Sequence, residues 1–285
     1  MNGILIVNKE QNWTSNDVVQ KVKKFTGEKV GHTGTLDPLA TGVLPLLIGK
    51  GTLLSKYLMN HDKTYISKVK LGVKTDTADL EGEVIEKETI EDSFFEEKKI
   101  KEVLNSFIGK QKQTPPMYSA IKIKGKKLYE YARSGQNVEV PERNIEIYEI
   151  EFIDFYKETQ EIEFKLSCSK GTYIRSLCED IAKKLGTMGV MSSLKRTRVG
   201  EFKIEDAITI SEAQEMDLSE RIITIEKFFQ KNNKIELSSK DLTLFLNGVK
   251  LLRKEDDGIY RAYCNGDFIG VGVISGGLLK RDIIT

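Results

Sequence analysis

GHTGTLDPLATG, residues 31–42, combines three glycines and three threonines with a single acid, Asp37. Pro38 biases Asp37 away from helical backbone angles, and Gly34 and Gly42 permit conformations or close approaches that other residues resist. The stretch therefore predicts a compact loop that presents one carboxylate. The alternative from the residues alone is an Asp-Pro turn in which Asp37 caps local amides.

A lone aspartate does not fit the two-carboxylate scheme of glycosidases. It suits a nucleophile or an electrostatic partner at an anomeric carbon, and it needs a nearby cation to stay ionised when buried. A phosphate-binding P-loop is excluded by spacing, because Gly49-Lys50 is followed by glycine rather than serine or threonine.

Hydrophobic periodicity around this loop predicts a chain of mixed α and β structure. Strands are predicted at 3–7, 43–48 and 64–74, a strand hairpin at 145–155 and 160–168, and helices at 15–27, 86–102 and 174–185. From about residue 232, a short helix at 239–247 and strands at 248–252, 259–264 and 267–274 indicate a small β-rich module. Asn265-Gly266 between two of these strands is a hairpin signal.

Composition excludes several classes of protein. Lys plus Arg is 44 and Asp plus Glu is 43, so the net charge is close to zero. This excludes a protein that binds nucleic acid through its overall positive charge, but it does not exclude a local basic face. With two histidines and three widely spaced cysteines, neither a catalytic zinc site nor a disulfide framework is expected, and the thiols are predicted to be reduced and buried. No apolar run approaches a membrane span, and the N-terminus does not resemble a signal peptide.

Four stretches in order resemble the motifs of the TruB family, the tRNA pseudouridine-55 synthases. They are GHTGTLDPLATGVLP at 31–45, TPPMYSAIK at 114–122 continuing to GKKLY at 125–129, GTYIRSL at 171–177, and SLKRTRVG at 193–200. The resemblance covers about residues 3–202. It implies an α+β fold with a mixed, mainly antiparallel sheet of the pseudouridine synthase type, flanking helices, and a small C-terminal β-rich module.

The resemblance also implies a role for each matching residue. Asp37 would attack or stabilise the ribose C1′ of the target uridine, Arg175 would pair with Asp37, and Tyr65 would lie against the flipped base. The other implied RNA and pocket contacts are Lys9 and His32, Tyr173 and Leu194, and the basic stretch with Lys122, Lys124, Lys126 and Lys127. In one departure, Val190 stands where the family often has a histidine, which leaves an RNA contact there in doubt.

The implied domains are a catalytic domain at 1–231, with an RNA-clamping insertion at 111–141, and a PUA-like RNA-binding domain at 232–285. Isomerising uridine involves neither redox change nor net hydrolysis, so no cofactor and no metal are expected. The implied partner is the T-arm of tRNA. Neither a membrane nor an obligate protein partner is implied, and the protein is expected to be a cytoplasmic monomer. Two rival hypotheses are an RNA-binding or tRNA-folding factor, and a synthase that modifies another RNA within a protein complex.

Overall fold

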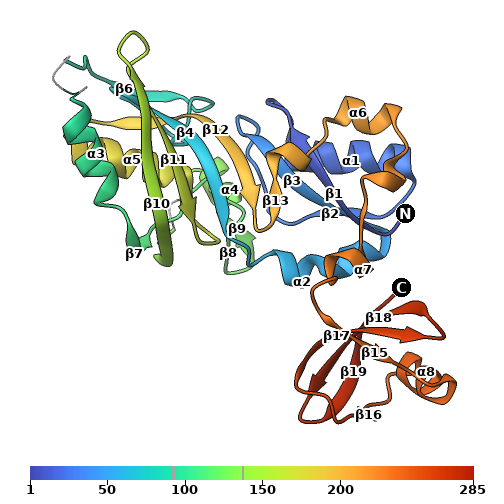
Figure 1. Cartoon of the computed structure of the whole chain (residues 1–285). Coiled ribbons are helices and arrows are strands. Elements are labelled where there is room, and N and C mark those ends of the chain that lie inside the picture. Colours follow the sequence, from blue (N-terminus) through green and yellow to red (C-terminus); the bar gives the residue numbers. More distant parts are fainter. Residues whose placement is uncertain (92–93, 95, 137) are drawn as a thin grey trace.

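The computed structural model describes residues 1–91, 94, 96–136 and 138–285. A mixed sheet of ten strands dominates it, with the main strand order β14-β1-β3-β12-β4-β11-β10-β7 (Figure 1). These strands are β14 (Ile223–Thr224), β1 (Gly3–Lys9), β3 (Thr41–Ile48), β12 (Gly189–Val199), β4 (Lys63–Leu71), β11 (Glu161–Cys168), β10 (Arg143–Tyr156) and β7 (Gly109–Gln113); β2 (Val30–His32) pairs with β3, and β13 (Phe202–Lys203) with β12. Every pairing is antiparallel except that of β3 with β12. The predicted mixed, mainly antiparallel sheet is confirmed.

Helices cover the sheet and follow local signals in the sequence. α1 (Ser15–Thr26) begins at a capping box formed by Thr14 and Asp17, and it ends at Gly27, whose φ of 68° favours glycine. α5 (Ile174–Leu185) buries its apolar face in the same core cluster as α3 (Glu97–Asn105). The shorter helices are α2 (Ser55–Leu58), α4 (Leu128–Arg133), α6 (Ile210–Glu215) and α7 (Ile225–Phe228), and η1 (Gly49–Leu54) is a 3₁₀ turn.

A small basic hairpin lies beside the main sheet. β8 (Lys122–Ile123) pairs with β9 (Lys126–Lys127), and the turn between them has positive φ at Lys124 and Gly125. Two consecutive positive φ values are typical of the tight turns that close hairpins. The basic stretch therefore contains a short hairpin.

The C-terminal module is a separate five-stranded sheet below α2 and α7, red in Figure 1. Its order is β15-β17-β18-β19-β16, with β15 (Asn233–Glu236), β17 (Gly258–Cys264), β18 (Asp267–Ser275), β19 (Leu278–Ile284) and β16 (Leu251–Leu252), next to α8 (Ser239–Leu246). Val271 and Ile283 of this module lie in one apolar cluster with Leu54 and Phe229. Asp282 also accepts hydrogen bonds from Lys56 and Tyr57 of α2, so the module is docked against the first sheet.

Some predicted elements were wrong or incomplete. The helix predicted at 86–102 is in part the strand β6 (Val84–Lys87), which pairs with β5 (Val73–Thr75); α3 begins only at Glu97, and residues 92, 93 and 95 lie outside the described part. The central strand β12 and the last strand β19 were not predicted. The three cysteines are free and buried, as predicted.

Candidate active site

A cavity of about 550 Å³ opens between the loop at 33–37, strands β4 and β12, and the start of α5. Six of the residues implied by the motifs line it, namely His32, Asp37, Tyr65, Tyr173, Arg175 and Leu194. They come from four separate stretches of the chain, which only the folded sheet brings together. Lys9 and the four hairpin lysines are not among the described lining residues.

The loop that carries Asp37 is anchored on both sides of that residue. Ser15 Oγ, buried at the start of α1, donates to the Leu36 carbonyl and accepts from the Leu36 amide. The carbonyl of Pro38 accepts from the backbone N–H of Asn12, at 2.9 Å. These bonds hold the short segment between them, so the backbone position of Asp37 does not depend on contacts of its own side chain.

Lys9 lies behind this loop and is fully buried. Its Nζ donates to the carbonyls of Glu10, Trp13 and Pro38, the last at 3.3 Å. Burial lowers the pKa of Lys9 to about 8, although the Asp37 carboxylate acts in the opposite direction. The structure thus gives Lys9 a contact to the residue that follows Asp37, rather than a place among the described lining residues of the cavity.

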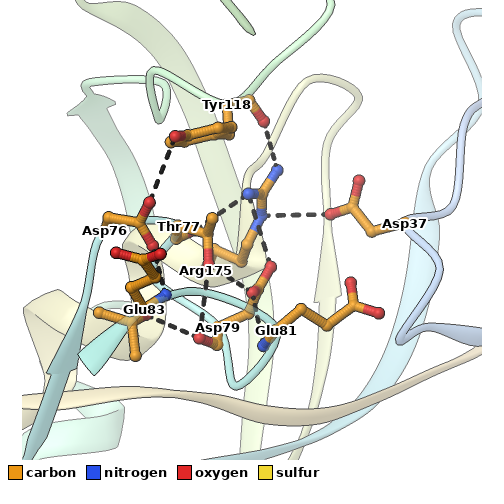
Figure 2. A network of polar contacts seen from close by, with 9 residues as sticks. Asp37, Asp76, Thr77, Asp79, Glu81, Glu83, Tyr118 and Arg175 are labelled. Atoms are coloured by element: carbon orange, nitrogen blue, oxygen red, sulfur yellow. Dashed lines mark hydrogen bonds and ion pairs between the residues drawn. The ribbon is translucent and has the colours of Figure 1, made fainter. Parts of the chain in front are cut away.

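Asp37 and Arg175 form the central ion pair of the cavity (Figure 2). Arg175 Nε lies 3.1 Å from Asp37 Oδ2; the arginine side chain is 7% exposed, whereas that of Asp37 is 37% exposed. The carboxylate therefore keeps an open side toward the cavity while its cation is fixed beneath it. This is the pairing that the motif resemblance implied.

Arg175 is itself held by three further oxygens. Its Nη1 lies 3.6 Å from Asp79 Oδ2 and donates to the Thr77 carbonyl at 3.0 Å, and its Nη2 donates to the Tyr118 carbonyl at 2.7 Å. Figure 2 shows the guanidinium between Asp37 on one side and the Asp79 loop on the other. Because all three nitrogens of the planar guanidinium have an oxygen partner, the orientation of Arg175 is fixed.

Sequence reasoning missed Asp79, which is buried and shares Arg175 with Asp37. Its loop, TDTADLEG at 75–82, mixes acids with small residues much as the Asp37 loop does. That similarity is the signal that could have identified it. The loop also contacts the insertion, because Tyr118 Oη donates to Asp76 Oδ2 at 3.2 Å.

Opposing influences set the protonation of Asp37. Its enclosure in the cavity raises the pKa of the carboxyl above its ordinary value, and the Asp79 carboxylate adds to this rise. The positive charges of Arg175 and Lys9 act against it. An aspartate buried without such cations would bind a proton more readily, so Arg175 favours the ionised form that a nucleophile requires.

Tyr65 forms another wall of the cavity, from strand β4, and is 7% exposed. Burial raises the pKa of its phenol to about 12, and the charge of Arg196, which stands opposite Tyr65 in the β4–β12 ladder, acts against this rise. Arg196, which lies within the fourth motif but was given no role, is the adjacent cation.

The remaining predicted residues complete the cavity. Leu194 is 9% exposed on β12, and Tyr173 precedes α5, where its N–H and carbonyl form a reciprocal pair with the Gln113 amide. His32 ends β2, and burial and Arg196 lower its pKa. Val190, at the departure from the motif, is fully buried in β12 opposite Lys70 and lies outside the described cavity lining.

Within the described part of the chain, no three His, Cys, Asp or Glu side chains gather in a way that could hold a metal ion. No helix among these residues combines the length and apolarity that a membrane crossing requires.

Comparison with solved structures identifies the fold. "Crystal Structure of a Cbf5-Nop10-Gar1 Complex" matches with a TM-score of 0.68 at 24% identity, covering 99% of this chain and 84% of that one. "Structure of H/ACA RNP bound to a substrate RNA containing 2'-deoxyuridine" matches with a TM-score of 0.67 at 22% identity and the same coverage. Both agree with the fold implied by the motifs, that of the pseudouridine synthases.

Comparison of sequences is more specific. The family model "TruB family pseudouridylate synthase (N terminal domain)" matches residues 21–174, and "tRNA pseudouridylate synthase B C-terminal domain" matches 175–227. A tRNA pseudouridine synthase B of Clostridium tetani is 46% identical, covering 95% of each chain, and one of Alkaliphilus oremlandii is 44% identical, covering 96% of this chain and 93% of the relative. The chain belongs to the TruB family. It is an enzyme that isomerises uridine to pseudouridine in tRNA.

Proposed function

We propose that this enzyme modifies the uridine at position 55, in the T-loop of tRNA, with Asp37 as its catalytic group. The observation that carries the proposal is the half-open Asp37 carboxylate, 3.1 Å from the buried Arg175 at the wall of the cavity. Asp37 acts at the ribose C1′ of a uridine flipped into this cavity. Tyr65, Leu194 and Tyr173 surround the base.

The reaction conserves all atoms of the nucleotide. The N1–C1′ bond breaks, the uracil rotates, a C5–C1′ bond forms, the proton on C5 leaves and N1 gains a proton. Asp37 acts either by bonding to C1′ or by stabilising its developing positive charge. Extruding the base from the folded loop costs a few kcal/mol, and aromatic stacking on Tyr65 offsets it by about 1–3 kcal/mol.

The basic hairpin supports RNA binding by the insertion at 111–141, of which residue 137 lies outside the described part. Lys122 and Lys124 are exposed, while Lys126 and Lys127 lie over the rings of Tyr131 and Tyr129. The insertion reaches the cavity at Ser119 and Ala120, and Tyr118 contacts Arg175 and Asp76. We propose that this segment clamps the RNA beside the flipped nucleotide.

Incubation with unmodified tRNA transcripts, followed by mapping of pseudouridine by position, tests the proposed target. We expect one modified site, at position 55, and no product from a transcript that carries cytidine there. Modification at another position only would refute the assignment to the T-loop. The same assay on an isolated T-arm hairpin shows whether that arm alone is sufficient.

Two rival functions are weaker. A folding factor that only binds tRNA has no need of a carboxylate with an open side, held against a buried arginine. A synthase working on another RNA inside a complex is suggested by the H/ACA RNP and the Cbf5-Nop10-Gar1 complex, yet those similar structures are less than 25% identical to this chain. We propose a cytoplasmic enzyme that acts alone as a monomer, for which sedimentation of the enzyme with and without tRNA is the test.

Replacing Lys122, Lys124, Lys126 and Lys127 together by glutamine is expected to weaken tRNA binding and reduce its salt dependence. Each lost phosphate contact removes about 0.7–0.9 from the slope of log affinity against log salt, so the slope should fall by up to about 3. Binding titrations at several salt concentrations measure this. The matched control replaces Lys98, Lys99, Lys183 and Lys184, exposed on α3 and α5, and an equal effect there would contradict the proposed clamp.

The C-terminal module at 232–285 is proposed to be a PUA-like RNA-binding domain. Deleting it would expose the cluster that contains Val271 and Ile283, so substitutions on its surface are the sharper test. Replacing the exposed Lys250 and Lys280 by glutamine is expected to weaken tRNA binding while leaving the single-turnover rate at saturating RNA unchanged. A reduced rate at saturation with unchanged affinity would instead assign the module a part in catalysis.

A further inference from the structure

Arg196 is a buried cation without a carboxylate partner. It lies on β12, is 2% exposed and lines the cavity next to Tyr65. Among the described residues, no carboxylate oxygen lies within 4.0 Å of its guanidinium, in contrast to Arg175. Burying a charge without a counter-ion is costly. Such departures from the rules of stable folding are expected at functional sites.

Two of its hydrogen bonds fix the ends of the Asp37 loop. Nη2 donates to the Gly34 carbonyl at 3.0 Å, and Nε donates to the Val43 carbonyl at 2.8 Å. Gly34 precedes Asp37 in the loop, and Val43 follows the loop at the start of β3. A single side chain therefore holds both ends of the segment that carries the carboxylate.

The backbone at Arg196 shapes the same loop. Gly42 pairs with Arg196 in the parallel β3–β12 ladder and has a φ of 103°. A Cβ at Gly42 would lie 2.2 Å from the Arg196 carbonyl oxygen, which no side chain could tolerate without a shift of the backbone. The close approach sets the distance between β12 and the loop, and it lets the Arg196 side chain reach both carbonyls.

The third polar neighbour of Arg196 is Tyr65, which stands directly opposite it in the antiparallel β4–β12 ladder and whose phenol feels the charge of the guanidinium. A guanidinium has donors only, so in a hydrogen bond between them the Tyr65 oxygen is the acceptor. The phenolic proton is then directed away from Arg196. Since burial raises the pKa of this phenol to about 12, the hydroxyl keeps its proton near neutral pH and can donate it within the cavity.

We infer that Arg196 is a positioning residue for the reaction, which holds both ends of the Asp37 loop and orients the Tyr65 hydroxyl as a donor toward the bound base. The inference rests on the proposed roles of Asp37 and Tyr65. It assigns to one buried side chain the relative placement of two groups that lie on different elements. Lysine could not replace it, because one ammonium group cannot reproduce the planar fork that bonds both carbonyls.

The test uses the full-length enzyme and unmodified tRNA. Arg196→Lys is expected to lower the single-turnover rate at saturating RNA by about 10²-fold, the effect of a small misplacement of reacting groups, with tRNA affinity within a few-fold of wild type. Arg198→Lys is the matched control, because Arg198 lies on the same strand and bonds Thr64 and Gly200 outside the cavity. It should retain the wild-type rate.

Coupling to Tyr65 separates positioning from a purely structural role. Tyr65→Phe should slow the wild-type enzyme strongly, but it should slow the Arg196→Lys enzyme much less, because the hydroxyl is no longer oriented there. Multiplicative effects of the two substitutions, or a wild-type rate in Arg196→Lys, would overturn the inference. So would loss of the folded state in both Arg196→Lys and Arg196→Gln, judged by circular dichroism.

The proposed function is tested separately in the same experiment. Modification of position 55 by the wild-type enzyme, together with an inactive Asp37→Asn variant, supports the proposed function whatever Arg196→Lys does. If Asp37→Asn is active, the proposed role of Asp37 is refuted, whatever the result for Arg196→Lys.

Discussion

Asp37→Asn is expected to abolish pseudouridine formation, lowering the single-turnover rate at saturating tRNA by at least ~10⁴-fold, as loss of a nucleophile does in other enzymes. Asparagine keeps the size of the side chain and can still accept a hydrogen bond from Arg175, but it has neither the negative charge nor the nucleophilic oxygen. The loop itself should be unchanged, because it is held through Leu36 and Pro38. Affinity for tRNA should therefore stay within a few-fold.

Asp76→Asn is the matched control for this prediction. Asp76 belongs to the adjoining network but is exposed and contacts Tyr118 and the Glu83 amide rather than Arg175. Its loss should change the rate only slightly. Comparable rates for Asp37→Asn and the wild type would show that another group performs the chemistry.

Arg175→Gln is expected to lower the rate by about 10³-fold, the upper range for removing one preorganised electrostatic contact. It also leaves the buried Asp79 carboxylate without its cation, which costs about 3–5 kcal/mol of stability in comparable buried pairs. Arg175→Lys keeps the charge but not the four-oxygen geometry, so it should be more stable and still slow. Thermal unfolding and single-turnover kinetics, measured on both variants, separate the two effects.

The pH dependence gives the same prediction a second readout. Arg175 lowers the pKa of Asp37 against the rise caused by burial, so its removal should raise that pKa further. Activity needs ionised Asp37 and is lost as the pH falls through its pKa. The acid limb of the rate profile should therefore move to higher pH in Arg175→Gln and less so in Arg175→Lys. An acid limb in the same place in all three enzymes would contradict the ion pair as the control on Asp37.

Local sequence signals predicted many elements of the fold correctly. α1 has its capping box and its terminal glycine, and the β17–β18 hairpin has its Asn-Gly turn. β12 was missed because Ser192 and Arg196 occupy buried positions along it, where a core strand would carry apolar side chains. The sequence of this central strand therefore resembles a connecting segment, because β12 contributes side chains to the cavity as well as to the core.

The site could be predicted only in part. Asp37, Arg175 and Tyr65 lie within short motifs that can be matched by residue and order. Asp79 and Arg196 contribute through contacts between distant segments, to Arg175 in one case and to Gly34, Val43 and Tyr65 in the other. A buried charge has no periodic signal in the sequence, and its partners appear only once the sheet has formed.

The docked C-terminal module has a consequence for how the protein unfolds. Val271 and Ile283 share an apolar cluster with Leu54 and Phe229, and Asp282 bonds Lys56 and Tyr57 across the same junction. Separating the two sheets would expose that cluster to water and break the hydrogen bonds that the half-buried Asp282 carboxylate accepts. Heating should therefore melt both sheets in one cooperative transition, seen as a single calorimetric peak, rather than releasing the smaller sheet first.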